Sequence, residues 1–409
     1  MVGMRRRSLA QPIDELAFSD HKIAFVSGPR QCGKTTLAKM LLRTREEGKY
    51  YNWDELTFRR LWARDPSAAL PAAGSKTIPL VVLDEIHKNR RWKRDLKGIF
   101  DTRTRPCDML VTGSARLSVY IKGSDSLLGR HLSFRLHPFS LREMETAKIL
   151  GPDDAIDKLF SRASRRSRAR EDRLAALMTY GPFPEPLLAQ DARKVRIWRR
   201  NHEQLIVRQD LRDLSRLPEL GRIEMLNALL PERIGSLFSF ASIGRDLEAS
   251  IPTVKRWIGY LKALYYLFEV KPYYRGVRRS LRREGKVYLW DYGAVPNEAA
   301  RFENLVAGHL LKTCHLWTDT GEGEFDLYYL RNKEKQEIDF LIVRDGVPWL
   351  PIEVKLADVD PAPSWRVFGK LLSCKHGIQV VRDPAWKIHS IGGTEILVAG
   401  AAQVLHCFA

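Results

Sequence analysis

A glycine-containing loop between an apolar segment and a helical pattern constrains this chain more than any other feature. Residues 23–26 are Ile-Ala-Phe-Val, residues 28–36 are Gly-Pro-Arg-Gln-Cys-Gly-Lys-Thr-Thr, and apolar residues then recur at helical spacing as far as Leu41. Two glycines at this spacing allow backbone N–H groups to surround a phosphate, and the following helix adds the positive end of its dipole. The segment therefore predicts a P-loop. A glycine turn with a solvated lysine is the alternative, and the flanking strand and helix argue against it.

The residues of this loop would take different parts in binding a nucleotide. Gly28 and Gly33 would allow the backbone to wrap the phosphates, and Lys34 would reach the β- and γ-phosphates. The Thr35 hydroxyl would bind Mg²⁺, while Thr36 lies one step further into the helix. The predicted cofactors are accordingly ATP and Mg²⁺.

A second apolar run ends in two acids. Residues 79–83 are Pro-Leu-Val-Val-Leu, and Asp84 and Glu85 follow them. Continuous hydrophobicity predicts a strand buried on both faces, and ligands of such sheets lie at the carboxyl ends of the strands. We expect Asp84 to hold Mg²⁺ through water and Glu85 to polarise the attacking water as general base. Two acids after a strand are also common turn residues, and the P-loop favours the catalytic interpretation.

Two further segments offer candidates for contact with the nucleotide. A strand predicted at residues 109–111 leads to Thr112 and Ser114, either of which could sense the γ-phosphate or only cap a turn. Arg130 precedes another short strand, and we expect it to act as an arginine finger at the nucleotide of a neighbouring subunit. A plain surface arginine is the alternative. The arginine finger implies a homo-oligomer, such as a ring.

These motifs resemble those of the AAA-type P-loop ATPases of bacteria and archaea that carry a C-terminal domain of unknown function with a nuclease-like fold. The likeness rests on residues 28–36, 83–86, 112–114, 129–143 and 180–185, which follow one another in that family's order. It extends to the C-terminal strands and so covers nearly the whole chain. The resemblance implies the ATPase fold and ATP binding, and it implies no single biological role.

The charge of the chain favours a polyanionic partner. The 409 residues include 68 Lys and Arg against 49 Asp and Glu, which gives a formal charge of +19. Basic residues gather in an arginine-rich run at 161–170 and in the segment 270–288, which contains five arginines and Lys286. We therefore predict sequence-tolerant binding to DNA. The alternatives are a solubilising surface charge and, for the run at 161–170, a solvated linker or helix face.

Residues 242–264 have the pattern of a helix-turn-helix. Val254, Trp257 and Leu261 lie on one apolar stripe, and Pro252 suits the first turn of the second helix. The basic segment that follows contains two strand-like runs, so this part of the chain is predicted to be a winged helix with a basic wing. DNA binding is the favoured function, although many winged helices only dock other domains.

Four polar residues near the C-terminus resemble the core of the PD-(D/E)XK nucleases. Glu303 lies on a predicted helix, Asp339 on one predicted strand, and Glu353 and Lys355 on one face of the next. In that family two carboxylates, here Asp339 and Glu353, hold Mg²⁺, and the lysine assists the water that attacks the phosphodiester. The resemblance implies the fold and leaves cleavage open, because such a domain can bind DNA without cutting it. A Glu–Lys pair can also be a plain salt bridge.

The predicted architecture is α/β, with a P-loop AAA-type ATPase core at residues 1–190, a helical and winged-helix domain at 191–290, and a restriction-endonuclease-like α/β domain at 291–409. The expected function is ATP hydrolysis coupled to the binding or movement of DNA, branched DNA included. A nucleotide-gated switch or regulator without motor or nuclease activity is the alternative. No apolar run reaches the roughly 18 residues of a membrane span, so we expect a cytoplasmic protein without membrane partners.

Overall fold

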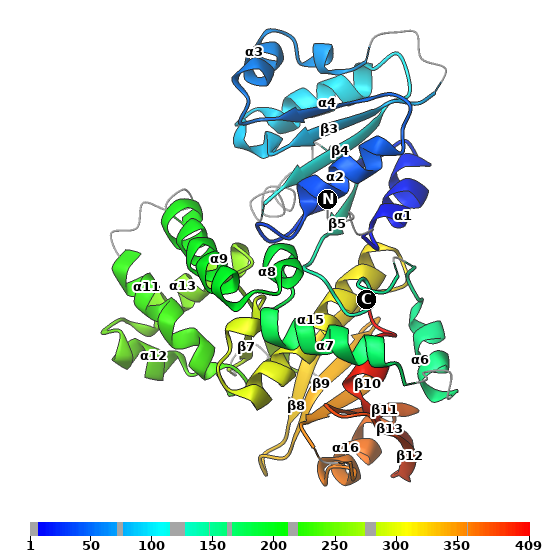
Figure 1. The fold of residues 1–409 in the computed structure, drawn as a ribbon, viewed down its shortest axis with the longest axis vertical. Coiled ribbons are helices and arrows are strands. Elements are labelled where there is room, and N and C mark those ends of the chain that lie inside the picture. The colour runs from blue at the N-terminus through cyan, green and yellow to red at the C-terminus, as the bar shows by residue number, and fades with distance from the viewer. Residues whose placement is uncertain are drawn as a thin grey trace. The chain divides into compact units, whose positions relative to one another are not determined.

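The chain forms two compact units, Met1–Pro138 and Phe139–Ala409. Their elements are drawn in Figure 1. The first unit therefore ends at residue 138, whereas the sequence predicts an ATPase core that continues to residue 190. No helix of the described chain is both long and apolar enough to cross a membrane. The computed structural model describes residues 7–71, 77–114, 127–146, 148–161, 166–211, 220–274, 284–357 and 359–409.

A parallel five-stranded sheet forms the centre of the first unit, in the order β2-β3-β4-β1-β5. The strands β1, β3 and β4 are buried along their whole length, as their continuous apolar sequences predict. Because all five strands are parallel, their carboxyl ends meet at one edge, and the predicted P-loop leaves β1 at that edge. The strands are β1 (Ile23–Ser27), β2 (Gly48–Asn52), β3 (Leu80–Asp84), β4 (Asp108–Gly113) and β5 (His131–Arg135).

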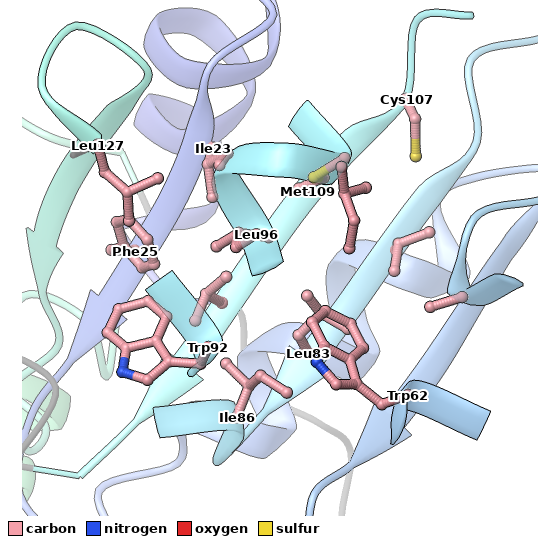
Figure 2. Close-up of a cluster of buried hydrophobic side chains, with 14 of the residues drawn as sticks. Ile23, Phe25, Trp62, Leu83, Ile86, Trp92, Leu96, Cys107, Met109 and Leu127 are labelled. Carbon is pink, nitrogen blue, oxygen red and sulfur yellow. The ribbon is translucent and has the colours of Figure 1, made fainter. Parts of the chain in front are cut away.

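Helices pack on this sheet through two separate sets of side chains. The helices α3 (Leu56–Arg64) and α4 (Trp92–Thr102) pack against one face through the buried cluster in Figure 2. In this cluster the rings of Phe25 and Trp92 meet edge to face, with their centroids 5.7 Å apart. The helix α2 (Lys34–Arg43) contacts β2, β3 and β4 through residues outside the cluster. Short helical segments complete the unit: α1 (Ala10–Pro12), η1 (Ile13–Phe18), η2 (Pro66–Ala69) and η3 (Ile86–Lys88).

An eight-stranded mixed sheet forms the centre of the second unit, in the order β12-β13-β11-β10-β9-β8-β6-β7. The pairs β10–β11, β11–β13 and β6–β8 are parallel, and the other neighbours are antiparallel. The long helix α15 (Glu298–Asp319) packs against β7, β8, β9 and β10. The strands are β6 (Leu267–Pro272), β7 (Lys286–Leu289), β8 (Phe325–Arg331), β9 (Glu337–Arg344), β10 (Val347–Lys355), β11 (His376–Val381), β12 (Trp386–Ile391) and β13 (Thr394–Gly400).

The segment 139–146 belongs to the second unit because its polar groups bond to α15. The Leu141 N–H donates to Nε2 of His309 at 3.0 Å, and burial lowers the pKa of His309 to about 4, so that this nitrogen can accept. Lys312 of α15 forms a buried ion pair with Glu143. The remaining helices of this unit are α6 (Pro152–Phe160), α7 (Arg168–Tyr180), α8 (Pro184–Ala189), α9 (Ala192–Gln204), η5 (Leu205–Asp210), α11 (Leu220–Leu229), η6 (Leu230–Arg233), η7 (Tyr292–Ala294), α16 (Ser364–Leu372) and α17 (Ala401–Val404).

Two helices lie at the predicted helix-turn-helix, α12 (Phe240–Asp246) and α13 (Ile251–Ala263). Ser250 caps α13 by accepting the Thr253 N–H at 3.3 Å, and Trp257 of α13 is fully buried. The hairpin β6–β7 follows, and β6 also pairs in parallel with β8, so the hairpin extends the large sheet. The arginines of the predicted wing lie outside the described residues, and the winged-helix assignment stays a prediction.

Candidate active site

The loop after β1 has the backbone conformation that its glycines predict. A Cβ atom at Gly28 would lie 2.1 Å from the carbonyl oxygen of Leu136, a distance that no side chain tolerates. Gly33 has φ 101° and caps α2 in a left-handed conformation, which glycine adopts without strain. Both glycines are therefore required by this loop for different reasons, one for space and one for backbone angle.

Lys34 is the first residue of α2, and its side chain folds back over the loop. Its ammonium donates to the carbonyl oxygens of Gly28 at 3.0 Å and Pro29 at 2.6 Å, and the residue is only 8% exposed. A cation is thus held at the amino end of a helix, where backbone N–H groups and the helix dipole also attract anions. Thr36 lies in the same first turn and is exposed.

Asp84 is the centre of a hydrogen-bond cluster at the carboxyl edge of the sheet. Its Oδ2 accepts the hydroxyls of Thr35 at 2.8 Å and Tyr50 at 2.7 Å, and its Oδ1 accepts the hydroxyl of Thr112. The strand register brings these groups together, because Asp84 of β3 lies opposite Asn52 of β2 and Thr112 of β4. The structure thus joins Thr35 and Asp84, the two residues predicted to hold Mg²⁺.

The donor set around Asp84 fits a hard divalent cation. Mg²⁺ prefers oxygen ligands, and here a hydroxyl and a carboxylate face each other beside the P-loop. Thr35 is exposed to solvent, whereas Asp84 is only 3% exposed. The hydroxyls that now surround Asp84 are neutral, and a cation that approached the carboxylate would meet no positive charge from them.

Glu85 follows directly and has a left-handed backbone with φ 60°. Its N–H donates to the Thr112 carbonyl at 2.8 Å, and its carboxylate lies 3.6 Å from Nε2 of His87 and 3.7 Å from Nζ of Lys88. Burial raises the pKa of Glu85, while the charges of Lys34 and Lys88 act in the opposite direction. A partly buried carboxylate of raised pKa is suited to accept a proton.

Tyr50 is the member of this cluster that sequence reasoning missed. Burial and the hydrogen bond to Asp84 raise its pKa, so the phenol stays protonated and serves as a donor. Its contact with Asp84 depends on β2 lying next to β3 in this register, which local sequence does not specify. Of the two candidates on β4, Thr112 makes the bond to Asp84, and Ser114 lies buried just beyond the strand.

Arg130 lies away from the P-loop of its own unit. Its carbonyl accepts the N–H of Ile23 at 2.9 Å, which places it at the amino end of β1, and its guanidinium bonds both oxygens of Asp101 at 2.7 and 3.1 Å. Arg135, at the other end of β5, pairs with Ser27 at the carboxyl edge. The structure therefore places Arg135, and not Arg130, at the edge that carries the P-loop. The action of Arg130 on a neighbouring subunit stays a prediction.

The four polar residues predicted near the C-terminus come together in the second unit, around a fifth residue. Glu303 of α15 and Asp339 of β9 both lie close to the ammonium of Lys286, at 3.0 and 3.5 Å. On β10, Glu353 pairs with Lys355 at 2.6 Å, and the Val354 N–H donates to Asp339 at 2.9 Å. Sequence reasoning missed Lys286 as a member of this group, since it was counted among the basic residues of the wing.

Glu303, Glu337, Asp339 and Glu353 are hereafter called the acid cluster. Burial and the charge of Asp339 raise the pKa of Glu353 to about 7, although Lys355 acts in the opposite direction. Within the described ranges, no group of three or more His, Cys, Asp and Glu side chains is arranged to hold a metal ion. The predicted metal ligands Asp339 and Glu353 are thus close to each other, but the cluster in which they lie already contains a lysine ammonium.

Comparison with known families finds three matches along the chain. Residues 20–145 match the family described as AAA domain, and residues 171–303 and 299–394 match two families described as domains of unknown function, DUF8612 and DUF4143. The first match spans the parallel sheet, the P-loop and the two acids after β3. The other two fall in the second unit and bring no known activity with them.

Relatives of this chain carry no described function either. An uncharacterised protein of Mycobacterium tuberculosis is 22% identical over 80% of this chain and 69% of its own length, and one of Methanocaldococcus jannaschii is 23% identical over 85% and 78%. A Walker-type ATPase of Pyrococcus abyssi aligns with 14% identity over 73% of this chain and 95% of its own, with a TM-score of 0.42. The match of residues 20–145 to the AAA domain family thus covers the segment that contains the P-loop, Asp84 and Glu85.

Proposed function

We propose that the first unit hydrolyses ATP and that the protein uses this reaction in handling DNA. The observation that supports hydrolysis most strongly is the meeting of Thr35 with Asp84, next to Glu85, at the edge from which the P-loop leaves. Nucleotide binding without hydrolysis would require only the P-loop and a cation. A carboxylate of raised pKa beside them adds the means to activate water.

The residues would act as follows. The loop N–H groups and the Lys34 ammonium bind the phosphates, with Lys34 exchanging its carbonyl partners for phosphate oxygens. Mg²⁺, held by Thr35 and Asp84, would neutralise charge on the β- and γ-phosphates. Glu85 accepts a proton from water as the water oxygen attacks the γ-phosphorus. The bond from that phosphorus to the β–γ bridging oxygen breaks, which yields ADP and phosphate.

The proposal that the protein binds DNA is supported by its positive charge. In the arginine-rich run, Arg166, Arg168 and Arg170 are engaged by acids at 2.8, 3.2 and 3.1 Å. Arg166 and Arg168 are exposed and can exchange these acids for phosphates, and the segment 275–283, which contains five arginines, is a second candidate for such contact.

The decisive experiment measures ATP turnover without DNA and with single-stranded, duplex and branched DNA. Stimulation by one of these supports the proposal, and equal turnover in all of them contradicts the coupling. Binding as a function of salt then locates the contact: replacing Arg278, Arg279, Arg282 and Arg283 by Ala should reduce the log–log slope by up to ~4. A variant with Lys333, Lys335, Arg366 and Lys370 replaced, all exposed elsewhere in the second unit, is the charge-matched control.

The expected assembly is a homo-oligomer in which Arg130 acts at a neighbour's nucleotide. Its ion pair with Asp101 is partly exposed and so can be exchanged for a partner's phosphate. Mixing inactive Arg130→Ala and Glu85→Gln subunits should restore part of the turnover, because some interfaces then combine an intact Glu85 with an intact Arg130. Full turnover by a monomer would contradict this assembly.

A nucleotide-gated switch without nuclease activity is the second candidate. The lysine within the acid cluster favours it, because that arrangement does not resemble a site prepared for a metal-dependent cut. The same turnover experiment separates the two candidates, since a switch would hydrolyse ATP at a rate that DNA does not alter.

A further inference from the structure

Lys286 is fixed in the acid cluster by the strand that carries it. It is the first residue of β7, where it pairs with Val270 of β6 and forms a further bridge with Leu237. Backbone pairing with two neighbouring segments therefore fixes the position of Lys286 independently of its carboxylate partners. The residue is 3% exposed, so its ammonium is removed from water.

The Lys286 ammonium has three carboxylates around it. Nζ lies 3.0 Å from Glu303 Oε1 and 3.5 Å from Asp339 Oδ1, and it also pairs with Glu337. Glu303 comes from α15, and Glu337 and Asp339 come from β9. Three acceptors match the three N–H donors of a lysine, and a buried charge is tolerated only when it is paired in this way.

Neighbouring side chains compensate part of the remaining negative charge. Tyr288, two residues along β7, donates to the same Glu303 oxygen at 2.6 Å. Arg331 pairs with Glu337 at 3.0 Å, and Lys355 pairs with Glu353 at 2.6 Å. Four carboxylates thus face three basic side chains. A divalent cation added to this group would meet the fixed charge of Lys286 at contact distance.

We propose that Lys286 is the resident cation of the acid cluster, so that the second unit binds no divalent metal at Asp339 and Glu353. Removing the ammonium should convert the cluster into a divalent-cation site with Glu303, Asp339 and Glu353 as oxygen ligands. One oxygen of Glu353, Oε2, is buried without a partner in the described structure and is available for such a role. The inference does not depend on ATP hydrolysis or on DNA binding by this protein.

The test is a titration of the full-length, nucleotide-free protein with Mn²⁺. At each step the concentration of free Mn²⁺ is measured by electron paramagnetic resonance. We expect the wild type and Asp339→Asn to bind the same number of Mn²⁺ ions, because the wild type should have no Mn²⁺ site at Asp339. In Lys286→Met we expect one new site, at least tenfold tighter than any in the wild type, which Lys286→Met/Asp339→Asn loses. Lys262→Met is the matched control, because Lys262 pairs with one acid, Glu269, and its removal should create no site.

Two results would overturn the proposal. One is a wild-type Mn²⁺ site that disappears in Asp339→Asn, and the other is a folded Lys286→Met protein that gains no site. If Lys286→Met does not fold, the comparison of wild type with Asp339→Asn still shows whether the wild type has an Mn²⁺ site that depends on Asp339. Lys286→Arg, which keeps the charge, should then fold and should bind no Mn²⁺ through Asp339.

Discussion

Each unit of this protein has carboxylates at the centre of a polar site, and the groups that bind these carboxylates differ between the two sites. In the first unit Asp84 accepts hydrogen bonds from the hydroxyls of Thr35, Tyr50 and Thr112. In the second, the carboxylates surround the buried ammonium of Lys286. Neutral donors leave the negative charge of a carboxylate uncompensated, whereas a fixed ammonium compensates it.

This difference separates a site that can exchange ligands from one that is closed to them. Hydroxyls can turn away from Asp84 when a cation arrives, and nothing buried is then left with an unpaired charge. Removing Lys286 would leave three partly buried carboxylates, which are 13–21% exposed, without their shared cation. We therefore connect the first site with binding and turnover, and the second with the stability of the fold.

The largest expected effect is on turnover in the first unit. Glu85→Gln keeps the shape of the side chain but cannot accept a proton, so ATP turnover should fall about 10²–10⁴-fold while nucleotide binding persists. Glu47→Gln, an exposed acid in the same unit, should hydrolyse ATP as the wild type does. Steady-state phosphate release and binding of a fluorescent nucleotide measure the two properties. Undiminished turnover in Glu85→Gln would remove Glu85 as the base.

A second prediction compares two lysines of the second unit. Lys286→Met should lower the free energy of unfolding by about 3–5 kcal/mol, because it leaves buried carboxylates without their cation. Lys262→Met breaks one partly exposed ion pair and should cost about 1 kcal/mol or less. Urea unfolding at pH 7.5 measures both. Equal losses would show that the acid cluster does not depend on its lysine.

A third prediction addresses the hydroxyls around Asp84. Tyr50→Phe removes one donor to a carboxylate and should cost about 1.5 kcal/mol of stability without nucleotide. The loss should shrink when ATP and Mg²⁺ are bound, since the cation then compensates Asp84. Tyr51→Phe, on the same strand, is the control, because Tyr51 packs on Phe58 through its ring. A loss that is unchanged by ligand would contradict an exchangeable site.

The last expected effect is a pH dependence of stability that arises from the acid cluster. Glu353 titrates near pH 7 in the folded protein and near 4.5 when unfolded, so between these values the folded state binds more protons. Stability should therefore fall as the pH rises from about 4.5 to 7, by at most ~1.4 kcal/mol per pH unit. The difference in unfolding free energy between wild type and Glu353→Gln isolates this contribution, with Asp339 and Lys355 unchanged. A difference that rises with pH would contradict it.

Local sequence was sufficient for the P-loop and for the acids after β3. Gly28 follows β1 directly, and Asp84 and Glu85 lie at the end of β3; parallel strands bring such ends together without further information. Tyr50 and Lys286 could not be found in this way, because their roles depend on which strands are neighbours and in which register. The pairing of β6 with β8 depends in the same way on contacts between strands that are far apart in the chain.

The close approach of Gly28 to Leu136 also has a mechanical consequence. The Leu136 N–H donates to the carbonyl of Ser27 at 2.8 Å, and the Arg7 guanidinium joins the carbonyls of Cys32 and His137. The phosphate loop and the segment 136–137 are thus clamped together with no free space between them. A displacement of the loop by a bound phosphate must move this segment, which lies one residue before the last residue of the unit.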